Sequence, residues 1–491
     1  MSESPSEQSQ SLDSTLRAQM RGHLRGHLRG HLRAHLRTVA QRVATEYRSH
    51  ARYALRWVLL VSPASLATGS VVAFFLVSLD AVTEWRWSHP WLLFLLPLAG
   101  VGVGVVYHYL GKSAEAGNNL IVDEIHQPGA GVPGRMAPLI LFGTLLTHLF
   151  GGSAGREGTA VQMGGSIASV FERLVARSKL LELDDTDRRV LLQAGIAAGF
   201  GAVFGTPITG AVFALEVLAI GQLSYGALVP CLIASVIGDW TTHAWGVAHT
   251  AYPKLSLQAL GIDAVDLRTL IKISIAAAAF GLASTLFSET THGLGRVFRR
   301  LVRVPWLRPA LGGLIVIALT FLVRGDDYLG LGVRSPNPDG VSILASFRDG
   351  HIPSSAWALK TLFTSVTLSS GFKGGEVTPL FFVGATLGHT LAELLRAPIP
   401  LFAAAGFVGV FAGATNTPLA CTIMGIELFG AETGVYLAAA CFLSYLFSGH
   451  SGIYLSQRVG VAKGDLVTAP NGVALRDLHS TPGQEDVRHR T

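Results

Sequence analysis

Residues 151–162 read Gly-Gly-Ser-Ala-Gly-Arg-Glu-Gly-Thr-Ala-Val-Gln, and they place a charged pair, Arg156 and Glu157, inside an otherwise apolar stretch. A carboxylate in the hydrocarbon of a bilayer is costly, so such residues usually line a polar path. Residues 159–171 read as a helix whose first turn offers free N–H groups and a positive dipole potential to an anion. The segment predicts either an anion site beside a titratable group or a structural ion pair.

A carboxylate at the start of that helix would compete with the anion for the same amides. Protonation of the carboxylate would release the position, and this exchange would couple proton movement to anion movement. Glu157 is therefore the predicted gating and proton-coupling residue, and Gly155, Arg156 and Gly158 are the predicted anion-binding residues around it.

A second segment, residues 374–379, reads Gly-Gly-Glu-Val-Thr-Pro and repeats this design. A proline near the first helical turn costs little, since its missing N–H has no partner there, so a helix is expected over residues 379–389. The start of this helix adds four predicted anion-binding residues: Gly375, Glu376, Val377 and Thr378.

Two further polar residues are candidates for the same site. Asn118, in the segment Gly-Asn-Asn-Leu at residues 117–120, can donate amide N–H groups to an anion or can serve as an ordinary helix cap. Tyr454 lies near the end of the last long apolar run, where its hydroxyl could donate to an anion or belong to an interfacial aromatic belt.

The composition is that of a membrane protein. Only 14% of the 491 residues are charged, against about 25% in soluble domains, and 49% are hydrophobic. These values exclude a disordered chain, a nucleic-acid-binding domain and an ordinary cytosolic enzyme. The three cysteines show no CxxC spacing, and no metal site or cofactor is expected.

The apolar runs divide the chain into three parts. Residues 58–460 contain many charge-free runs, several near the ~20 residues that span hydrocarbon and others short or interrupted by Gly or Pro. They predict an all-α, polytopic membrane domain with broken or re-entrant helices and halves at about 58–240 and 265–460. A basic extension, residues 1–57, precedes it, and a short polar tail, residues 461–491, follows it.

The N-terminal extension repeats the tetrapeptide Arg-Gly-His-Leu from Arg21 onward. Its arginines outnumber its acidic residues by ten to four, and this excess before the first apolar run predicts a cytoplasmic N-terminus. A period of four favours a helix lying on anionic lipid, whereas low complexity favours an unstructured extension. Histidine clustering is also compatible with metal binding or pH sensing.

An internal repeat relates the two halves. Pro207 stands nine residues before Glu216, and Pro418 stands nine residues before Glu427, at an offset of 211 residues. The two glycine-rich segments described above keep the same order at an offset of 219 residues. Duplicated membrane halves commonly place their site at the repeat interface near the midplane.

Across residues 58–460 the chain resembles the chloride-channel (CLC) family of anion channels and anion/proton antiporters. The segment Gly-Arg-Glu-Gly-Thr-Ala-Val-Gln at residues 155–162 is similar to the family's GREGP-x-VQ segment, and residues 374–379 are similar to GG-x-F-x-P. The resemblance implies a homodimer of subunits built from two inverted-topology halves, each subunit with its own anion path. It also implies that Glu157 is the gating glutamate and Tyr454 the pore tyrosine.

The departures from the family pattern are equally specific. Asn118 replaces a serine, Val217 stands where many chloride/proton exchangers have a second glutamate, and Val377 replaces a phenylalanine. This combination resembles the bacterial fluoride/proton antiporter branch. Glu216 and Glu376 are the candidates for a second proton-handling residue, although Glu216 is equally compatible with a structural role.

Together these features predict a multi-pass antiporter of the cell inner membrane that exports fluoride in exchange for protons. The alternatives on the same fold are a chloride/proton exchanger and a passive chloride channel. The expected partners are fluoride or chloride, protons, the lipid bilayer and a second copy of the chain, with no nucleic acid. No GxSxG or HExxH motif occurs within the apolar runs, so an enzyme is not expected.

Overall fold

A computed structural model describes residues 5–178, 182–262, 265–464 and 472–478. Helices make up 74% of the chain, which confirms the predicted all-α class. The chain divides into two units, residues 1–59 and residues 60–491, and each is described separately.

The first unit is helical from residue 5 onward and forms the beginning of α1 (Pro5–Ser88). The Arg-Gly-His-Leu repeats lie within this helix. Its residues from position 35 to 53 are exposed. The backbone is therefore helical through the extension, and its binding to anionic lipid stays a prediction.

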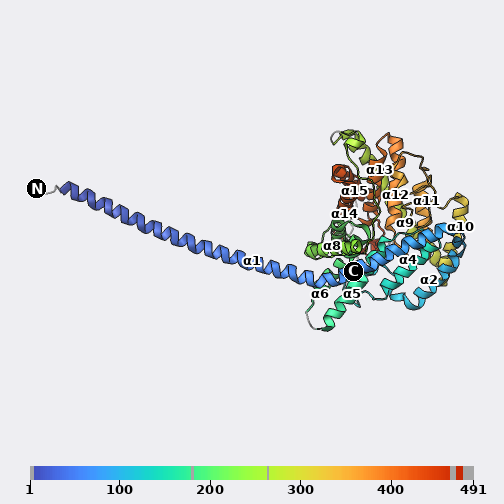
Figure 1. Cartoon of the computed structure of the whole chain (residues 1–491), viewed down its shortest axis with the longest axis horizontal. Coiled ribbons are helices and arrows are strands. Elements are labelled where there is room, and N and C mark those ends of the chain that lie inside the picture. The colour runs from blue at the N-terminus through green and yellow to red at the C-terminus, as the bar shows by residue number, and fades with distance from the viewer. Residues whose placement is uncertain (1–4, 179–181, 263–264, 465–471, 479–491) are drawn as a thin grey trace, which may run out of the picture. The chain divides into compact units, whose positions relative to one another are not determined.

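The second unit contains the rest of α1 and two series of helices (Figure 1). The first series is α2 (Leu96–Leu110), α3 (Asn118–His126), α4 (Met136–Leu149), α5 (Glu157–Ser178), α6 (Asp185–Phe204), α7 (Pro207–Glu216) and α8 (Leu228–Ala244). The second series is α9 (Leu267–Leu301), α10 (Arg308–Val323), α11 (Ala356–Ser370), α12 (Val377–Leu395), α13 (Ile399–Thr415), α14 (Pro418–Phe429), α15 (Gly434–Phe447) and α16 (Leu475–Leu478).

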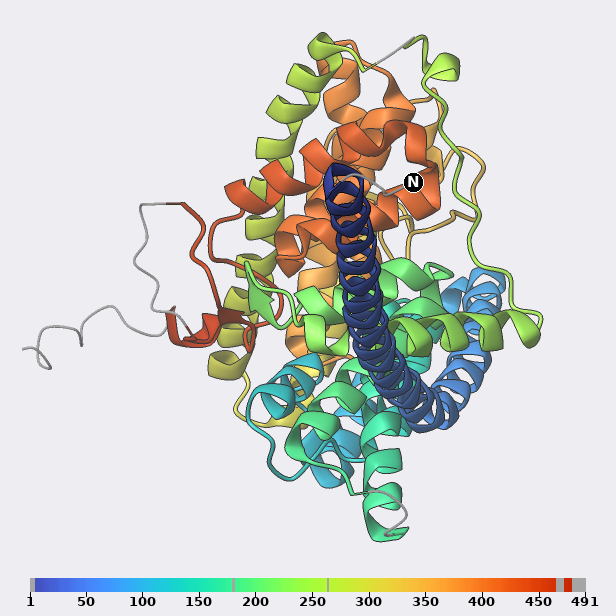
Figure 2. The ribbon, with the colours of Figure 1, turned by 90° about the vertical axis from the view of Figure 1, so that its left-hand side faces the viewer.

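Short elements complete the second unit. Strands β1 (Ala219–Ile220) and β2 (Arg458–Val459) pair in parallel, so the segment after α15 returns to the end of the first half (Figure 2). Single 3-10 turns are η1 (Pro90–Leu95), η2 (Lys112–Ala114), η3 (Tyr225–Ala227), η4 (Gln258–Leu260), η5 (Pro305–Leu307), η6 (Ala345–Phe347) and η7 (Ala431–Thr433).

The helix order α4–α8 is repeated as α11–α15, and the local chain geometry repeats with it. Gly205 caps the end of α6 and Asn416 caps the end of α13, both in the left-handed conformation with φ of 72° and 58°. Each is followed by a threonine and then by a proline in the first turn of the next helix, where the missing N–H costs nothing. The repeat found in the sequence is thus a repeat of structure.

Among the described residues, five helical stretches are long and apolar enough to cross a membrane: His35–Ser88, Pro90–Leu110, Leu267–Leu301, Pro305–Val323 and Val377–Leu395. Others, such as α7 and α14, are apolar but have only 10–17 residues. A polytopic membrane protein with interrupted helices has this mixture, because short helices can end at polar groups buried inside the protein.

Glycines permit close packing between consecutive long helices in both halves. A β-carbon added at Gly164 in α5 would lie 2.1 Å from the carbonyl oxygen of Gly195 in α6. A β-carbon added at Gly384 in α12 would lie at the same distance from the carbonyl oxygen of Gly406 in α13. Small residues allow this backbone-to-backbone approach, which takes the place of a hydrophobic driving force in lipid.

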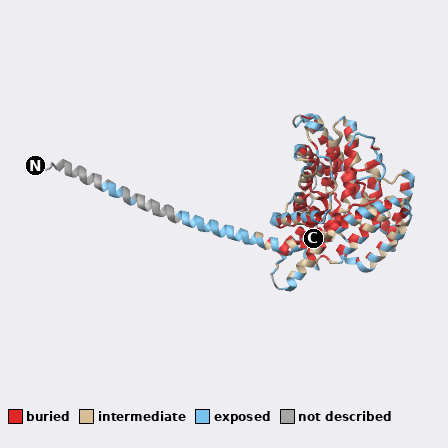
Figure 3. Cartoon of the chain, viewed as in Figure 1, coloured by how far each residue is buried: buried red, intermediate tan, exposed pale blue. Residues whose placement is uncertain are grey.

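A cluster of phenylalanine rings joins the two halves at the centre of the molecule. Phe204 of α6 packs edge-on to Phe381 of α12, and Phe381 stacks on Phe407 of α13 with ring centroids 3.9 Å apart. Figure 3 shows that buried residues run through the helices of the second unit. The two helix starts that form the candidate site are set on this common core.

We expect Gly384→Ala to destabilise the protein, because the new methyl group would overlap the carbonyl of Gly406. Overpacking of this kind costs typically ~1–3 kcal/mol. Gly102→Ala in α2 is the matched control, since a β-carbon there meets nothing within 4 Å. Thermal unfolding of the detergent-solubilised protein should show a lower midpoint only for Gly384→Ala; equal midpoints would contradict the packing argument.

Candidate functional site

The site is built on a backbone contact between the two halves. Gly155 donates its N–H to the carbonyl of Gly375 at 2.6 Å, and Gly375 donates to the carbonyl of Gly155 at 2.8 Å. These bonds form an isolated antiparallel bridge just before α5 and α12 begin. The starts of two helices, with their unpaired N–H groups, therefore lie together.

Gly158 and Gly375 are glycines because the junction has no room for a side chain at either position. A β-carbon on Gly375 would lie 2.7 Å from the backbone nitrogen of Gly158. A β-carbon on Gly158 would lie 3.1 Å from the α-carbon of Gly375 and 3.2 Å from Nδ2 of Asn118. The predicted residues Gly158, Gly375 and Asn118 are thus brought into direct proximity.

The carboxylate of Glu157 lies between the two helix starts and is only 2% exposed. Its Oε2 accepts hydrogen bonds from the backbone N–H of Arg156 at 3.2 Å and of Thr378 at 3.0 Å, and from the Thr378 hydroxyl. Its Oε1 lies 3.4 Å from Nε of Arg156. The side chain of one half is therefore held by the first turn of a helix from the other half.

Both helices at the site begin two residues earlier than the sequence predicts, at Glu157 and at Val377. Residues in a first helical turn lack an N–H bond within the helix, so polar residues there resemble loop residues in a sequence. The earlier start is significant because it places Glu157 itself in the first turn of α5. Val377, the first residue of α12, is 1% exposed.

Asn118, Glu376 and Tyr454 line a cavity of about 160 Å³ beside this junction. Asn118 begins α3, and its Oδ1 is buried with no hydrogen-bond partner in the described part of the chain. Tyr454, from the segment after α15, is 4% exposed. The structure thus joins three residues far apart in sequence, and all ten predicted site residues lie at the bridge or around this cavity.

Two larger cavities flank the junction. The first, about 480 Å³, is lined by Arg156, His148 and His249. The second, about 1110 Å³, is lined by Asn119, Glu376 and Lys373, which also border the 160 Å³ cavity. Glu157 does not itself line these three cavities; its chain neighbour Arg156 borders the first, and Glu376 of the opposite half borders the other two.

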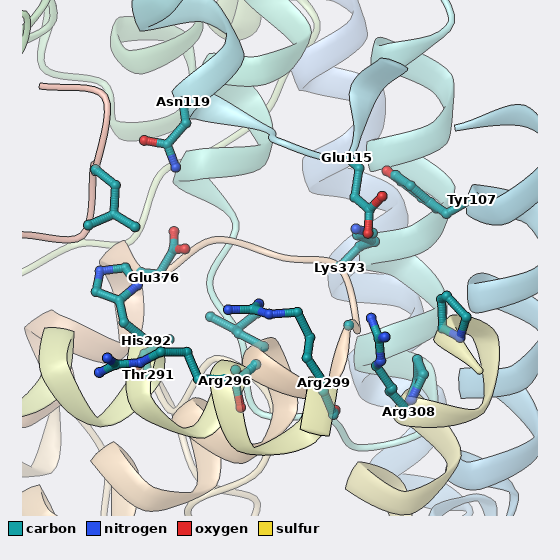
Figure 4. A pocket seen from close by; sticks show the side chains of 18 of the residues that line it. Tyr107, Glu115, Asn119, Thr291, His292, Arg296, Arg299, Arg308, Lys373 and Glu376 are labelled. Carbon is teal, nitrogen blue, oxygen red and sulfur yellow. The ribbon is translucent and has the colours of Figure 1, made fainter. Parts of the chain in front are cut away.

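The 1110 Å³ cavity has a basic wall. Figure 4 shows the side chains of Arg296, Arg299 and Arg308 projecting from α9 and α10 toward the space bordered by Glu115 and Glu376. Lys373 adds a further positive charge. Such a surface raises the local concentration of anions. The i, i+3 spacing of Arg296 and Arg299 in α9 is the signal in the sequence that places both on one helix face.

Two glutamates at the ends of short helices form a reciprocal pair of caps. Glu216, the last residue of α7, accepts from the N–H groups of Leu419 and Ala420 in α14 at 3.0 and 2.7 Å. Glu427 of α14 accepts from Ile208 and Thr209 of α7 at 3.1 and 2.8 Å. A carboxylate at a helix start satisfies its free N–H groups, so this arrangement favours the structural role for Glu216.

Residues 98–449 match the family model described as voltage gated chloride channel. This chain belongs to the voltage-gated chloride channel (CLC) family. A chloride/fluoride channel protein from Pseudomonas syringae pv. tomato is 46% identical to it over 88% of this chain and 93% of the relative. An H(+)/Cl(-) exchange transporter, ClcA, from Vibrio vulnificus is 25% identical over 78% of this chain and 84% of the relative.

Solved structures of CLC proteins share the fold. The crystal structure of a CLC-type fluoride/proton antiporter matches with a TM-score of 0.75 and 34% identity, over 82% of this chain and 98% of that one. A slow cyanobacterial Cl-/H+ antiporter matches with a TM-score of 0.66 and 20% identity, over 81% and 96% of the two chains. These matches confirm the family that the motifs indicated and the polytopic membrane fold.

We expect Glu427→Ala to lower the free energy of unfolding by about 1–2 kcal/mol, because it leaves N–H groups of α7 unpaired. Glu84→Ala, at an exposed position near the end of α1, is the control with the same change of charge. Thermal unfolding of the two variants in detergent measures the difference. If both unfold at the wild-type temperature, the cap contributes nothing to stability.

Proposed function

We propose that the protein is a proton-coupled anion antiporter that exports fluoride in exchange for protons. The observation that carries this proposal is the position of Glu157. Its carboxylate accepts hydrogen bonds from the start of α12, where a small anion could accept the same bonds. The residues around it border two separate cavities, Arg156 the first and Asn118 and Glu376 the second.

The proposed cycle follows from competition for these donors. When ionised, Glu157 occupies the N–H and hydroxyl groups of Thr378 and closes the junction. When protonated, it loses its charge-assisted bonds and its attraction to Arg156, and it leaves the donors to the anion. One proton and one anion thus use the same place in turn, which is the basis of antiport.

Two features favour fluoride over chloride as the anion. The polar groups of the cavity bordered by Asn118 include amide and hydroxyl donors from Asn118 and Tyr454, which suit a small and strongly hydrated anion. The relative that is 46% identical is named a chloride/fluoride channel protein, and the neighbour that is 34% identical is a fluoride/proton antiporter.

The arrangement in the cell is part of the proposal. We propose that the protein lies in the inner membrane as a homodimer, with the basic N-terminal extension in the cytoplasm. Exposed apolar side chains on α8, such as Val236 and Trp240, supply a surface that lipid or a second copy could cover. The positive residues at the end of α9 are consistent with a cytoplasmic side at that end.

Glu157→Gln is expected to abolish proton-coupled transport, because glutamine cannot bind and release a proton at this position. The measurement is fluoride movement in proteoliposomes under an imposed pH gradient, with proton movement counted in parallel. The wild type should drive fluoride against its concentration gradient, which a passive channel cannot do. Glu84→Gln is the control, and uphill fluoride transport by Glu157→Gln would disprove the role of Glu157.

Asn118→Ser is expected to shift selectivity toward chloride, because it shortens the side chain that reaches Gly158 and enlarges the adjoining cavity. Fluoride and chloride fluxes should be compared in the same liposomes. A rise in the chloride-to-fluoride flux ratio supports the proposal. An unchanged ratio, or a wild type that moves chloride as fast as fluoride, favours the chloride/proton exchanger instead.

A further inference from the structure

A cluster of three metal-ligating side chains lies at the end of α8, away from the Glu157 junction. Asp239 and His243 belong to the last turns of α8, and His249 follows in the next loop. One ligand atom from each lies within 4.8 Å of the other two. The cluster combines two imidazoles and one carboxylate.

Asp239 and His243 are spaced i, i+4 and so point from the same face of the helix. Nδ1 of His243 lies 3.1 Å from Oδ1 of Asp239, and the rings of His243 and His249 are 4.9 Å apart. Nδ1 of His243 also lies 3.0 Å from the backbone carbonyl of Asp239, and an ion bound at Nδ1 would replace the proton that Nδ1 donates to this carbonyl. His243 is exposed, so its ring can turn toward an ion without disturbing the core.

His249 is held in the orientation of a metal ligand. Its Nε2 lies 2.8 Å from the carbonyl of Ala202 and must carry the proton, since a carbonyl only accepts. Its Nδ1 then carries the lone pair, and this atom is buried without a hydrogen-bond partner in the described part of the chain. A histidine that donates its second nitrogen to a backbone carbonyl is the usual arrangement around protein-bound metals.

An acidic group lies beside the cluster. Glu427 lies close enough to Asp239 to interact with it electrostatically and adds negative charge. Gly205 leaves the room that His249 needs, because a β-carbon there would lie 2.9 Å from its Nδ1.

We propose that Asp239, His243 and His249 bind a divalent transition-metal ion, with Zn²⁺ as the ion that fits best. Two imidazoles and one carboxylate suit zinc, at metal–ligand distances of about 2.0–2.2 Å. The ligand atoms lie within 4.8 Å of one another, and rotation of the exposed His243 ring is the movement that would bring them closer to an ion. A fourth position would stay open to water or to an anion.

The metal site adjoins the route proposed for the anion. An effect of Zn²⁺ on transport is therefore also expected, and this expectation rests on the proposed function. His249 lines the 480 Å³ cavity together with Arg156. The next residue, Thr250, accepts a hydrogen bond from Arg156 at 3.5 Å, and Arg156 pairs with Glu157. An ion that fixes residues 243–249 would therefore restrict Arg156, and we expect Zn²⁺ to slow transport.

Metal binding is tested on the full-length, tag-free protein by isothermal titration with Zn²⁺ and by the visible absorption of bound Co²⁺. Any metal bound by the N-terminal histidines is a background common to all variants, so the result is the difference from wild type. His249→Ala and Asp239→Asn should each bind one metal ion fewer per chain, or bind that ion with at least about tenfold lower affinity. Even substitution of residues that only hydrogen-bond to metal ligands lowers metal affinity ~10–100-fold. His351→Ala, in an exposed loop, is the control.

Equal stoichiometry, affinity and Co²⁺ spectra in wild type and both variants would overturn the metal site. Size-exclusion profiles identify any variant that fails to fold. If His249→Ala does not fold, the result for Asp239→Asn decides whether the metal site exists, because asparagine is nearly isosteric with aspartate. In proteoliposomes, Zn²⁺ on the side of His249 should reduce wild-type fluoride flux several-fold and affect Asp239→Asn less. If Zn²⁺ binds but does not slow transport, only the regulatory role is disproved. The binding measurement does not depend on which anion the protein transports, so it tests the metal site even if fluoride is not the substrate.

Discussion

The paired hydrogen bonds between Gly155 and Gly375 are the constraint on which the site depends. They join two chain segments from different halves and hold the first turns of α5 and α12 at one point. Free N–H groups at helix starts are normally satisfied by water or by caps. Inside a membrane protein, two such starts facing each other create a strong requirement for negative charge, which either Glu157 or an anion can meet.

The same chemistry serves stability elsewhere in the fold. Glu216 and Glu427 each accept two N–H bonds from the first turn of the opposite short helix, and the phenylalanine core lies between the halves. Glu157 differs from these caps in its surroundings, because its neighbour Arg156 borders one cavity and Asn118 and Glu376, which lie at the same junction, border another. A carboxylate at a helix start becomes a candidate gate when an ion can reach the position it occupies.

The glycine-rich motifs and the repeat predicted the fold, because these features depend on local backbone requirements, and the resemblance of the motifs indicated the family. The meeting of Tyr454 with Asn118 was implied only by resemblance, since no spacing relates residues so far apart. The expectation of no metal site rested on the spacing of the cysteines and did not consider Asp239, His243 and His249, which the structure brings together. His249 becomes a partner only through the path of the loop after α8, and its hydrogen bond to Ala202 has no signature in the sequence.

The repeat is symmetrical in its backbone but not in its side-chain contacts, and this difference gives the site a direction. Thr378 and Thr159 occupy corresponding positions, two residues after Glu376 and Glu157. The Thr378 hydroxyl donates to Glu157 across the junction, whereas the Thr159 hydroxyl bonds to Thr144 within its own half at 2.9 Å. Glu376 instead lines both the 160 and the 1110 Å³ cavities. Two equivalent carboxylates thus have different surroundings, as a device that moves protons and anions in opposite directions requires.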